Sequence, residues 1–251
     1  MIKDRGILYC VSVGPGDPEL MTLKAVRVIR QCGVIALTVD RRAAGLAKGA
    51  DSAGERMNCV AYDIARGAVP ELDEKEILPL NLPMTKERER LERSHREAAD
   101  AIEGLLRQGR DVAYLTLGDT SVYASCMYPA LILKERGWTV EMVSGVPSFC
   151  AAAARLGEPL VTGAQSLHIL PTTYGVEEEL KLPGVKVLMK AGKKMEAVKE
   201  LLADSGDEIL AVERCGMEGE KIYRSLGELP ADAGYYTIVI VKEKGRETPA
   251  D

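Results

Sequence analysis

The sequence predicts an α/β fold of two domains: an amino-terminal domain with a parallel sheet (1–145) and a carboxyl-terminal α+β domain with a mixed sheet (146–251). Strand and helix signals alternate through the first half, which is typical of a parallel sheet with helices on both faces. The second half has more strand than helix signals, which favours a mixed or antiparallel sheet. Between them, the small residues Ala151–Ala154 and then Gly157-Glu158-Pro159 indicate a transition.

Apolar runs give the expected strands of the first half. They are residues 7–13, 34–39, 111–117 and 139–143. The run at 76–84 is also apolar, but Pro79 and Pro83 suit an edge strand or an extended loop better than a central strand.

Capping residues and apolar periodicity give the helices. The first is expected to begin at Pro18, with Asp17 as its N-cap, and to end before Gly33. Its expected apolar stripe is Leu20, Leu23, Val26 and Ile29. Another helix follows Thr120, and an alanine-rich one follows the turn at 143–149.

Two more helices are expected around the 76–84 run. Ser52-Ala53-Gly54-Glu55 has the form of a capping box, and Met57, Val60, Ala61 and Ile64 supply an apolar face after it. The segment from Lys86 to Arg107 is heavily charged, which is typical of a solvated helix face. Its apolar side is Leu91, Ala98, Ile102, Leu105 and Leu106.

The second half has its own pattern of elements. Its expected strands are 166–170, 185–189, 208–212 and 236–241, and its clear amphipathic helix is Met195 to Leu202. The tail after Lys244 is polar and is expected to fray.

Composition limits the possible partners. The net charge of −5 over 251 residues provides no overall field that would attract nucleic acid or anionic lipid. No apolar run has the length of a membrane span, and the first residues lead into a strand rather than a signal-peptide core, so we expect a cytoplasmic protein. The six cysteines form no C-x-x-C pair and are expected to be small buried hydrophobes. With only two histidines, a metal site is not supported.

Three glycine turns follow three expected parallel strands, at residues 14–20, 117–123 and 143–149. Each alone is more typical of a structural connection, but together they predict one crevice, since the carboxyl ends of parallel strands share an edge of the sheet. The first turn lacks the last glycine of G-x-G-x-x-G, which weakens a dinucleotide-binding interpretation.

Several segments in order resemble the tetrapyrrole methylases, S-adenosylmethionine-dependent enzymes of cobalamin and sirohaem synthesis. The segments that carry the resemblance are Val13–Leu20 with Thr22–Ala25, Leu82-Pro83-Met84-Thr85, Asp111–Asp119 with Tyr123, Gly145–Ser148 and Leu167–Pro171. The Pro-Met-Thr segment and the insertion before it favour the branch that methylates C-20 of precorrin-2 or cobalt-factor II. Thr120 and Pro147 depart from the family pattern, because each exchange relocates a proline.

The resemblance implies a homodimer that binds the methyl donor between its two domains and a tetrapyrrole at the first turn. The implied donor contacts are Gly118, Asp119, Val122, Tyr123, Ser148, Phe149, Met189, Glu213 and Cys215, the last two flanking Arg214. The implied substrate contacts are Pro15, Gly16, Asp17 and His168. No catalytic residue, metal, nucleic acid or membrane is implied.

The chemistry fits a site with few reactive groups. Methyl transfer from a sulfonium to a carbon is an in-line displacement that a dry, aligning cleft accelerates without a covalent nucleophile. The base that removes the proton from the attacked carbon stays open among carboxylate, tyrosine, histidine and water. Asp119 in a glycine turn is more typical of a residue that accepts backbone N–H groups than of a base. His168 lies in an apolar strand, which is more typical of a core histidine whose hydrogen bonds are satisfied. Tyr123 and Tyr174 could each contact a ligand or fill the core.

Substrate carboxylates call for basic partners, which the sequence does not single out. Arg88, Arg90, Arg93 and Arg96 are candidates, although a solvated helix face explains that run more simply. Two other hypotheses stay open: a methylase of the same fold with another acceptor (a different precorrin carbon, uroporphyrinogen III, an RNA ribose or a protein side chain), and a non-catalytic module that binds a nucleotide-like ligand.

Overall fold

A computed structural model describes residues 5–39 and 59–243. The chain divides into two compact units, 1–147 and 148–251, and each is described by itself. The capping box at Ser52–Glu55, Met57 and the tail after Lys244 lie outside the described residues.

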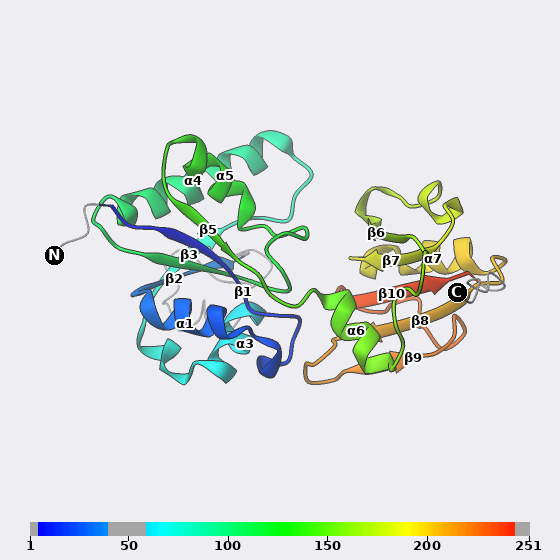
Figure 1. The fold of residues 1–251 in the computed structure, drawn as a ribbon. Coiled ribbons are helices and arrows are strands. Elements are labelled where there is room, and N and C mark those ends of the chain that lie inside the picture. The colour runs from blue at the N-terminus through cyan, green and yellow to red at the C-terminus, as the bar shows by residue number, and fades with distance from the viewer. Residues whose placement is uncertain (1–4, 40–58, 244–251) are drawn as a thin grey trace. The chain divides into compact units, whose positions relative to one another are not determined.

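The first unit contains a five-stranded sheet in the order β3-β2-β4-β1-β5, and every neighbouring pair is parallel (Figure 1). The strands are β1 (Leu8–Ser12), β2 (Val34–Val39), β3 (Glu76–Asn81), β4 (Val112–Thr116) and β5 (Val140–Val143). The predicted parallel sheet is therefore confirmed. The proline-bearing run is the edge strand β3, where the missing N–H of Pro79 leaves no interior ladder bond unmade.

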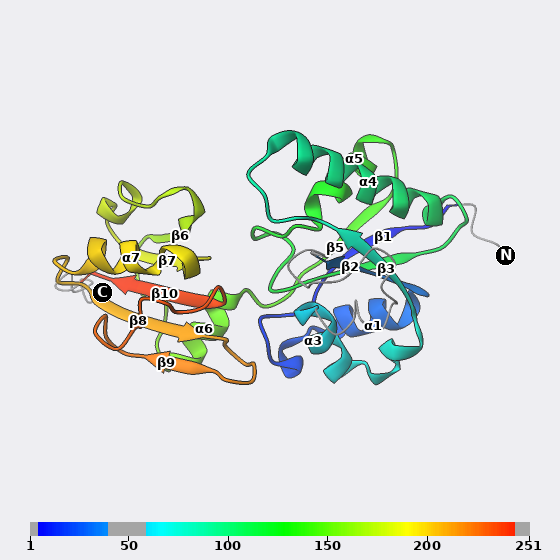
Figure 2. The ribbon, with the colours of Figure 1, turned by 180° about the vertical axis from the view of Figure 1, so that it is seen from behind.

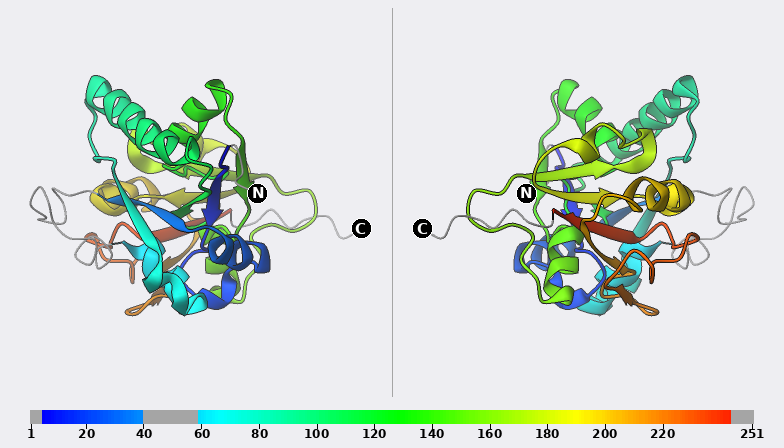
Figure 3. Two further views of the ribbon diagram at one scale, coloured as in Figure 1. Left: turned by 90° about the vertical axis from the view of Figure 1, so that its left-hand side faces the viewer. Right: turned by 90° about the vertical axis from the view of Figure 1, so that its right-hand side faces the viewer.

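Helices cover both faces of this sheet. They are α1 (Leu23–Gln31), α3 (Val60–Ala68), α4 (Arg88–Leu106) and α5 (Met127–Glu135). Figures 1 and 2 show α1 and α3 on one face and α4 and α5 on the other, and Figure 3 shows α1 and α4 on opposite sides of the strands. The predicted apolar side of α4 is confirmed at Ala98, Ile102 and Leu106, which pack in one core with Leu8 and Tyr114. Val60 begins α3, whose buried side includes Ala61 and Ile64.

The start of the first helix was predicted wrongly. Asp17 accepts a hydrogen bond from Glu19 N–H (2.8 Å), but it caps only the short 3-10 helix η1 (Pro18–Leu20). The α-helix begins after Thr22, whose hydroxyl accepts from Ala25 N–H (3.2 Å). The helical face therefore rotates: Leu23 is 89% exposed, and the buried residues are Ala25, Val28 and Ile29.

The start of α5 also differs from the prediction. Residues 120–126 form turns, and the helix begins only at Met127. Thr120 N–H instead binds Ser12 at the end of β1, and Ser121 binds Asp119 within the turn, as described below.

The second unit is a mixed five-stranded sheet in the order β6-β7-β10-β8-β9. Its strands are β6 (Leu167–Pro171), β7 (Val185–Met189), β8 (Glu208–Glu213), β9 (Lys221–Tyr223) and β10 (Thr237–Lys242). β6 and β7 are parallel, and the other pairs are antiparallel, which confirms the predicted mixed sheet. The short strand β9 was not predicted.

Two α-helices pack on the second sheet, α6 (Ser148–Leu156) and α7 (Met195–Leu202), and Figure 2 shows them on opposite faces. The bounds of α7 are those predicted, because its buried residues Met195, Val198 and Leu202 are spaced as one helical stripe against Val239. Four further 3-10 helices are η2 (Pro70–Glu74), η3 (Thr172–Tyr174), η4 (Glu179–Lys181) and η5 (Gly192–Lys194).

Five of the six cysteines are buried as predicted, but Cys150 on α6 is exposed, a correction to the prediction for that residue. All six are free thiols. No helix within 5–39 and 59–243 is long and apolar enough to cross a membrane.

Candidate active site

The three glycine turns lie side by side at one edge of the first sheet. β1 is flanked by β4 and β5, and all three run in the same direction, so their carboxyl ends lead into neighbouring turns. Gly118 N–H donates to the Gly14 carbonyl oxygen (2.8 Å), which joins the first two turns directly. This confirms the convergence that the sequence predicts for them.

Glycine is required in these turns for two different structural reasons. Gly14 (φ +76°) and Gly118 (φ +73°) adopt left-handed backbone conformations that side chains rarely tolerate. At Gly145 the reason is space: a Cβ there would lie 2.4 Å from Ser12 Cβ and 2.8 Å from the Gly118 carbonyl oxygen. At Gly118 a Cβ would meet no atom within 4 Å, so the backbone angle alone favours glycine at this buried position.

Asp119 holds the second and third turns together. Its Oδ2 accepts from Gly145 N–H (2.7 Å), and its Oδ1 accepts from Ser121 N–H (2.8 Å) and from the Ser121 hydroxyl. Burial acts to raise the pKa of this carboxyl, but the hydrogen bonds from Gly145 and Ser121 outweigh it and hold the pKa below its ordinary value. The side chain is thus an ionised acceptor of N–H groups, the role that the sequence favoured over a catalytic one.

The other predicted donor contacts of this region directly follow the second and third turns in sequence. Val122 N–H donates to the Asp119 carbonyl oxygen (3.2 Å). Tyr123 has a left-handed backbone (φ +50°) and a 46% exposed side chain. Ser148 and Phe149 begin α6, the first element of the second unit, and Phe149 is buried.

The second unit brings its own candidates to one sheet edge. β7 and β8 flank β10 and are both antiparallel to it, so Met189 and Glu213 end at the same edge. The residue after each strand, Lys190 (φ +61°) and Arg214 (φ +53°), has a left-handed backbone. Such strained conformations persist where surrounding contacts fix them, and they concentrate at functional sites.

Hydrogen bonds fix these two strand ends. The Met189 carbonyl oxygen accepts from the buried Thr172 hydroxyl (3.2 Å). The Glu213 carboxylate accepts from Gly234 N–H (2.8 Å) and from the Tyr223 hydroxyl (2.9 Å). Burial and the Glu213 charge raise the pKa of Tyr223 to about 12, so this hydroxyl remains a donor at neutral pH. Cys215, next to the Arg214 turn, is buried.

Comparison with known proteins identifies the family. The family model for Tetrapyrrole (Corrin/Porphyrin) Methylases matches residues 7–230. The chain belongs to this family.

Three relatives are similar to this chain over nearly their whole length. It is 34% identical to the probable cobalt-precorrin-2 C(20)-methyltransferase of Methanocaldococcus jannaschii, over 94% of this chain and 95% of the relative. The precorrin-2 C(20)-methyltransferase of a Sinorhizobium species is 31% identical, over 94% and 95%. The cobalt-precorrin-2 C(20)-methyltransferase of Salmonella typhimurium is 28% identical, over 96% and 98%.

Solved structures of tetrapyrrole methyltransferases share the fold. A cobalt precorrin-4 methyltransferase is 19% identical with a TM-score of 0.70, over 94% of both chains. A uroporphyrin-III C-methyltransferase of Thermus thermophilus complexed with S-adenosylhomocysteine is 23% identical with a TM-score of 0.61, over 95% of this chain and 98% of that one.

The residues with an implied substrate role fall in different units. Pro15 and Gly16 are buried in the first turn, and Asp17 follows them. His168 lies in the second unit on the edge strand β6, where its Nε2 is 2.9 Å from the Pro183 carbonyl oxygen. The imidazole is half-buried, and a backbone carbonyl satisfies the hydrogen bonding of this nitrogen. The side chain of Tyr174 lies outside the described part of the structure.

Sequence reasoning missed two residues that hold these turns together. Ser12 is fully buried at the end of β1, and its Oγ accepts from Thr120 N–H (2.9 Å). Thr22 caps α1 and also donates to the Ser144 carbonyl oxygen (3.2 Å). The sequence signal that could have singled out Ser12 is a lone hydroxyl side chain at the end of an otherwise apolar strand. Across 5–39 and 59–243, no group of three or more His, Cys, Asp or Glu side chains is arranged to hold a metal ion.

Proposed function

We propose that this chain is an S-adenosylmethionine-dependent methyltransferase that methylates C-20 of a precorrin-2-type ring, metal-free or cobalt-loaded, in cobalamin synthesis. The observation that carries the proposal is the similarity along 94–96% of the chain to relatives named for this reaction. The uroporphyrin-III C-methyltransferase complexed with S-adenosylhomocysteine supports the choice of donor.

The turns of the first unit suit such a donor. No atom lies within 4 Å of the position that a Cβ of Gly118 would take, which leaves room beside this turn for part of a ligand. We propose contacts to the donor from Gly118, Val122 and Tyr123, with Asp119 fixing the turns that bear them. From the second unit, we propose contacts from Ser148, Phe149, Met189, Glu213 and Cys215. Bound there, the donor supplies an electrophilic methyl group.

The protein's contribution to this chemistry is positioning. The hydrogen bonds of Asp119 and Ser12 fix the Gly118 and Gly145 backbone before any ligand binds, so little reorganisation accompanies the reaction. A methyl transfer in which the sulfonium charge disappears is favoured where water is excluded. The first turn, with Pro15, Gly16 and Asp17, is the proposed border of the tetrapyrrole site, and His168 is a further proposed contact.

Acceptor identity tests the proposal. The protein is incubated with donor labelled in the methyl group together with precorrin-2, cobalt-loaded precorrin-2, uroporphyrinogen III and RNA in separate reactions. We expect label in a precorrin-2-type ring, and the rates on the two forms show which one is the substrate. Label only in RNA or uroporphyrinogen III, or donor binding with no transfer to any acceptor, would contradict the proposal.

We also propose that the protein is a cytoplasmic homodimer. Its free thiols suit a reducing compartment. Tyr128 and Leu131 on α5 and Met142 on the edge strand β5 are exposed apolar side chains of the first unit, which suits burial against a second copy. Light scattering after size-exclusion chromatography is expected to give twice the chain mass, and a monomer would contradict the dimer.

A further inference from the structure

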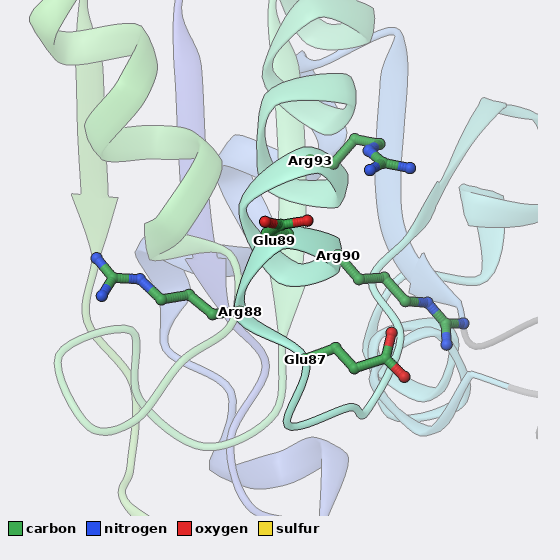
Figure 4. Close-up of a pocket in the computed structure, with 5 residues that line it drawn as sticks. All are labelled: Glu87, Arg88, Glu89, Arg90 and Arg93. Atoms are coloured by element: carbon green, nitrogen blue, oxygen red, sulfur yellow. The ribbon is translucent and has the colours of Figure 1, made fainter.

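A cavity of about 430 Å³ opens at the first turn of α4. Its lining residues are Glu87, Arg88, Glu89, Arg90 and Arg93 (Figure 4). It lies in the segment whose arginines the sequence explained as a solvated helix face.

The arginines of α4 divide into two groups. Arg88 and Arg96 both bind Glu92, with N–O distances of 2.8 and 3.9 Å. Arg90 and Arg93 form no ion pair or side-chain hydrogen bond with the rest of the described chain, although Glu89 and Glu97 lie four residues from Arg93. Ion pairing on the helix surface therefore accounts for Arg88 and Arg96 and not for the other two.

Arg90 and Arg93 point in one direction. They are three residues apart and so share a face of the helix. Figure 4 shows both guanidinium groups extending to the same side of α4, whereas Arg88 extends to the other. Arg90 is half-buried, which limits its motion before any ligand arrives. Two guanidinium groups one helical turn apart on the same side of a helix suit a ligand that carries more than one carboxylate.

Helix stability does not explain cations at this position. The amino-terminal end of a helix is its positive end, where a cation costs about 0.3–1 kcal/mol and an anion stabilises. Glu89 follows that rule, but Arg88 and Arg90 in the same turn oppose it, and the last turn of α4 has no basic residue. The N-cap Glu87 makes no side-chain cap bond, so its carboxylate does not offset the positive end of the helix by capping it. Residues that break a local stability rule are expected at functional sites.

The cavity belongs to the same sheet edge as the glycine turns. β3 runs parallel to the other strands, and residues 82–87 lead from its carboxyl end into α4. In the strand order β3-β2-β4, two strand spacings of about 4.8 Å each separate β3 from β4, the strand that leads into the Gly118 turn. A macrocycle of four pyrrole rings can span that separation.

We propose that Arg90 and Arg93 bind carboxylate side chains of the tetrapyrrole substrate and set its orientation on the carboxyl edge of the first sheet. This inference rests on the proposed function. The two arginines are binding residues and take no part in methyl transfer itself.

Steady-state kinetics of R90Q and R93Q on the ring substrate test the proposal, with R96Q as the control because Arg96 is paired and lies outside the cavity. We expect each variant to raise KM for the ring about tenfold, the loss typical of one charge-assisted hydrogen bond, with kcat unchanged. The R90Q and R93Q effects are expected to weaken as salt is raised, and R90K to recover part of the loss, because charge is retained. The Kd for S-adenosylhomocysteine should not change.

Thermal unfolding separates binding from a structural role. R90Q removes a cation from the positive end of α4, so its Tm should equal or slightly exceed that of the wild type. A lowered Tm with an unchanged KM would overturn the inference, as would a KM equal to that of R96Q. In both cases wild-type methylation of the ring leaves the proposed function intact. A wild-type protein that does not methylate the ring overturns the proposed function and this inference with it.

Discussion

At Gly145 a Cβ atom would lie 2.4 Å from Ser12 Cβ and 2.8 Å from the Gly118 carbonyl oxygen. Both neighbours are fixed: Ser12 is fully buried, and Gly118 is bonded to Gly14. Any side chain at this residue must therefore displace backbone of the neighbouring turn, and the geometry of three turns depends on its absence.

Gly145→Ala should destabilise the protein by about 1–3 kcal/mol, as overpacking does, and weaken S-adenosylhomocysteine binding at least as strongly. Gly104→Ala is the matched control, since its Cβ would meet no atom within 4 Å inside α4. That variant should gain about 0.5–1 kcal/mol through helix propensity. Urea unfolding and calorimetry measure both effects, and equal stabilities for the two variants would refute the steric argument.

Asp119→Asn tests the ionised state of the carboxylate. The folded pKa lies below the unfolded value of about 3.9, so its contribution to stability is fully present above that pH and is lost as the pH falls through the folded pKa. The variant leaves an N–H without its acceptor, so we expect a loss of about 1–3 kcal/mol at pH 7. Unfolding measured from pH 7 down to pH 3 should show the gap between wild type and variant closing in acid. A gap independent of pH would contradict the assignment.

At the scale of elements, the start of α1 shows why a capping signal can mislead. Asp17-Pro18-Glu19 has the composition of a helix start, and it does start a helical turn, but η1 ends at Leu20. Thr22 then starts α1, because its hydroxyl binds both Ala25 N–H and the Ser144 carbonyl oxygen. A contact 122 residues away in sequence decides between two local signals.

Thr22→Ala should therefore cost about 1 kcal/mol or more, whereas Asp17→Ala should cost about half as much, because it loses only the cap of η1. Thr22→Ser keeps the hydroxyl and serves as the control. Thermal unfolding of the three variants measures the order. If Asp17→Ala proved the more harmful, the start of α1 assigned here would be wrong.

Helices and strands could be predicted where their own hydrophobic pattern specifies them. The amphipathic stripe of α7 gave its bounds, and the apolar runs gave every strand except the three-residue β9, which is too short to show a pattern. The start of α5 was missed because Thr120 N–H binds the distant Ser12 hydroxyl, and the residues after it form local turns up to Cys126.

At the scale of the whole molecule, the two units carry different parts of the predicted site. Sequence motifs located the three turns of the first unit, since glycines next to apolar strands are visible in sequence. The hydrogen bonds that the Glu213 carboxylate accepts could not be predicted in the same way, because its partners Gly234 and Tyr223 come from other loops and strands.

If the second unit contributes to donor binding, Met189→Ala should raise the Kd for S-adenosylhomocysteine about tenfold, through lost apolar contact with the ligand. Met142→Ala is the control, because Met142 is 43% exposed on β5 of the first unit. Calorimetry measures both. Equal affinities for the two variants would remove Met189 from the donor site.

The most direct test of the central claim is the position of the transferred methyl group. Nuclear magnetic resonance of the ring product, formed from donor with an isotopically labelled methyl group, identifies the carbon that carries the label. The proposed function predicts a single labelled methyl at C-20. A label at any other carbon of the ring would contradict it.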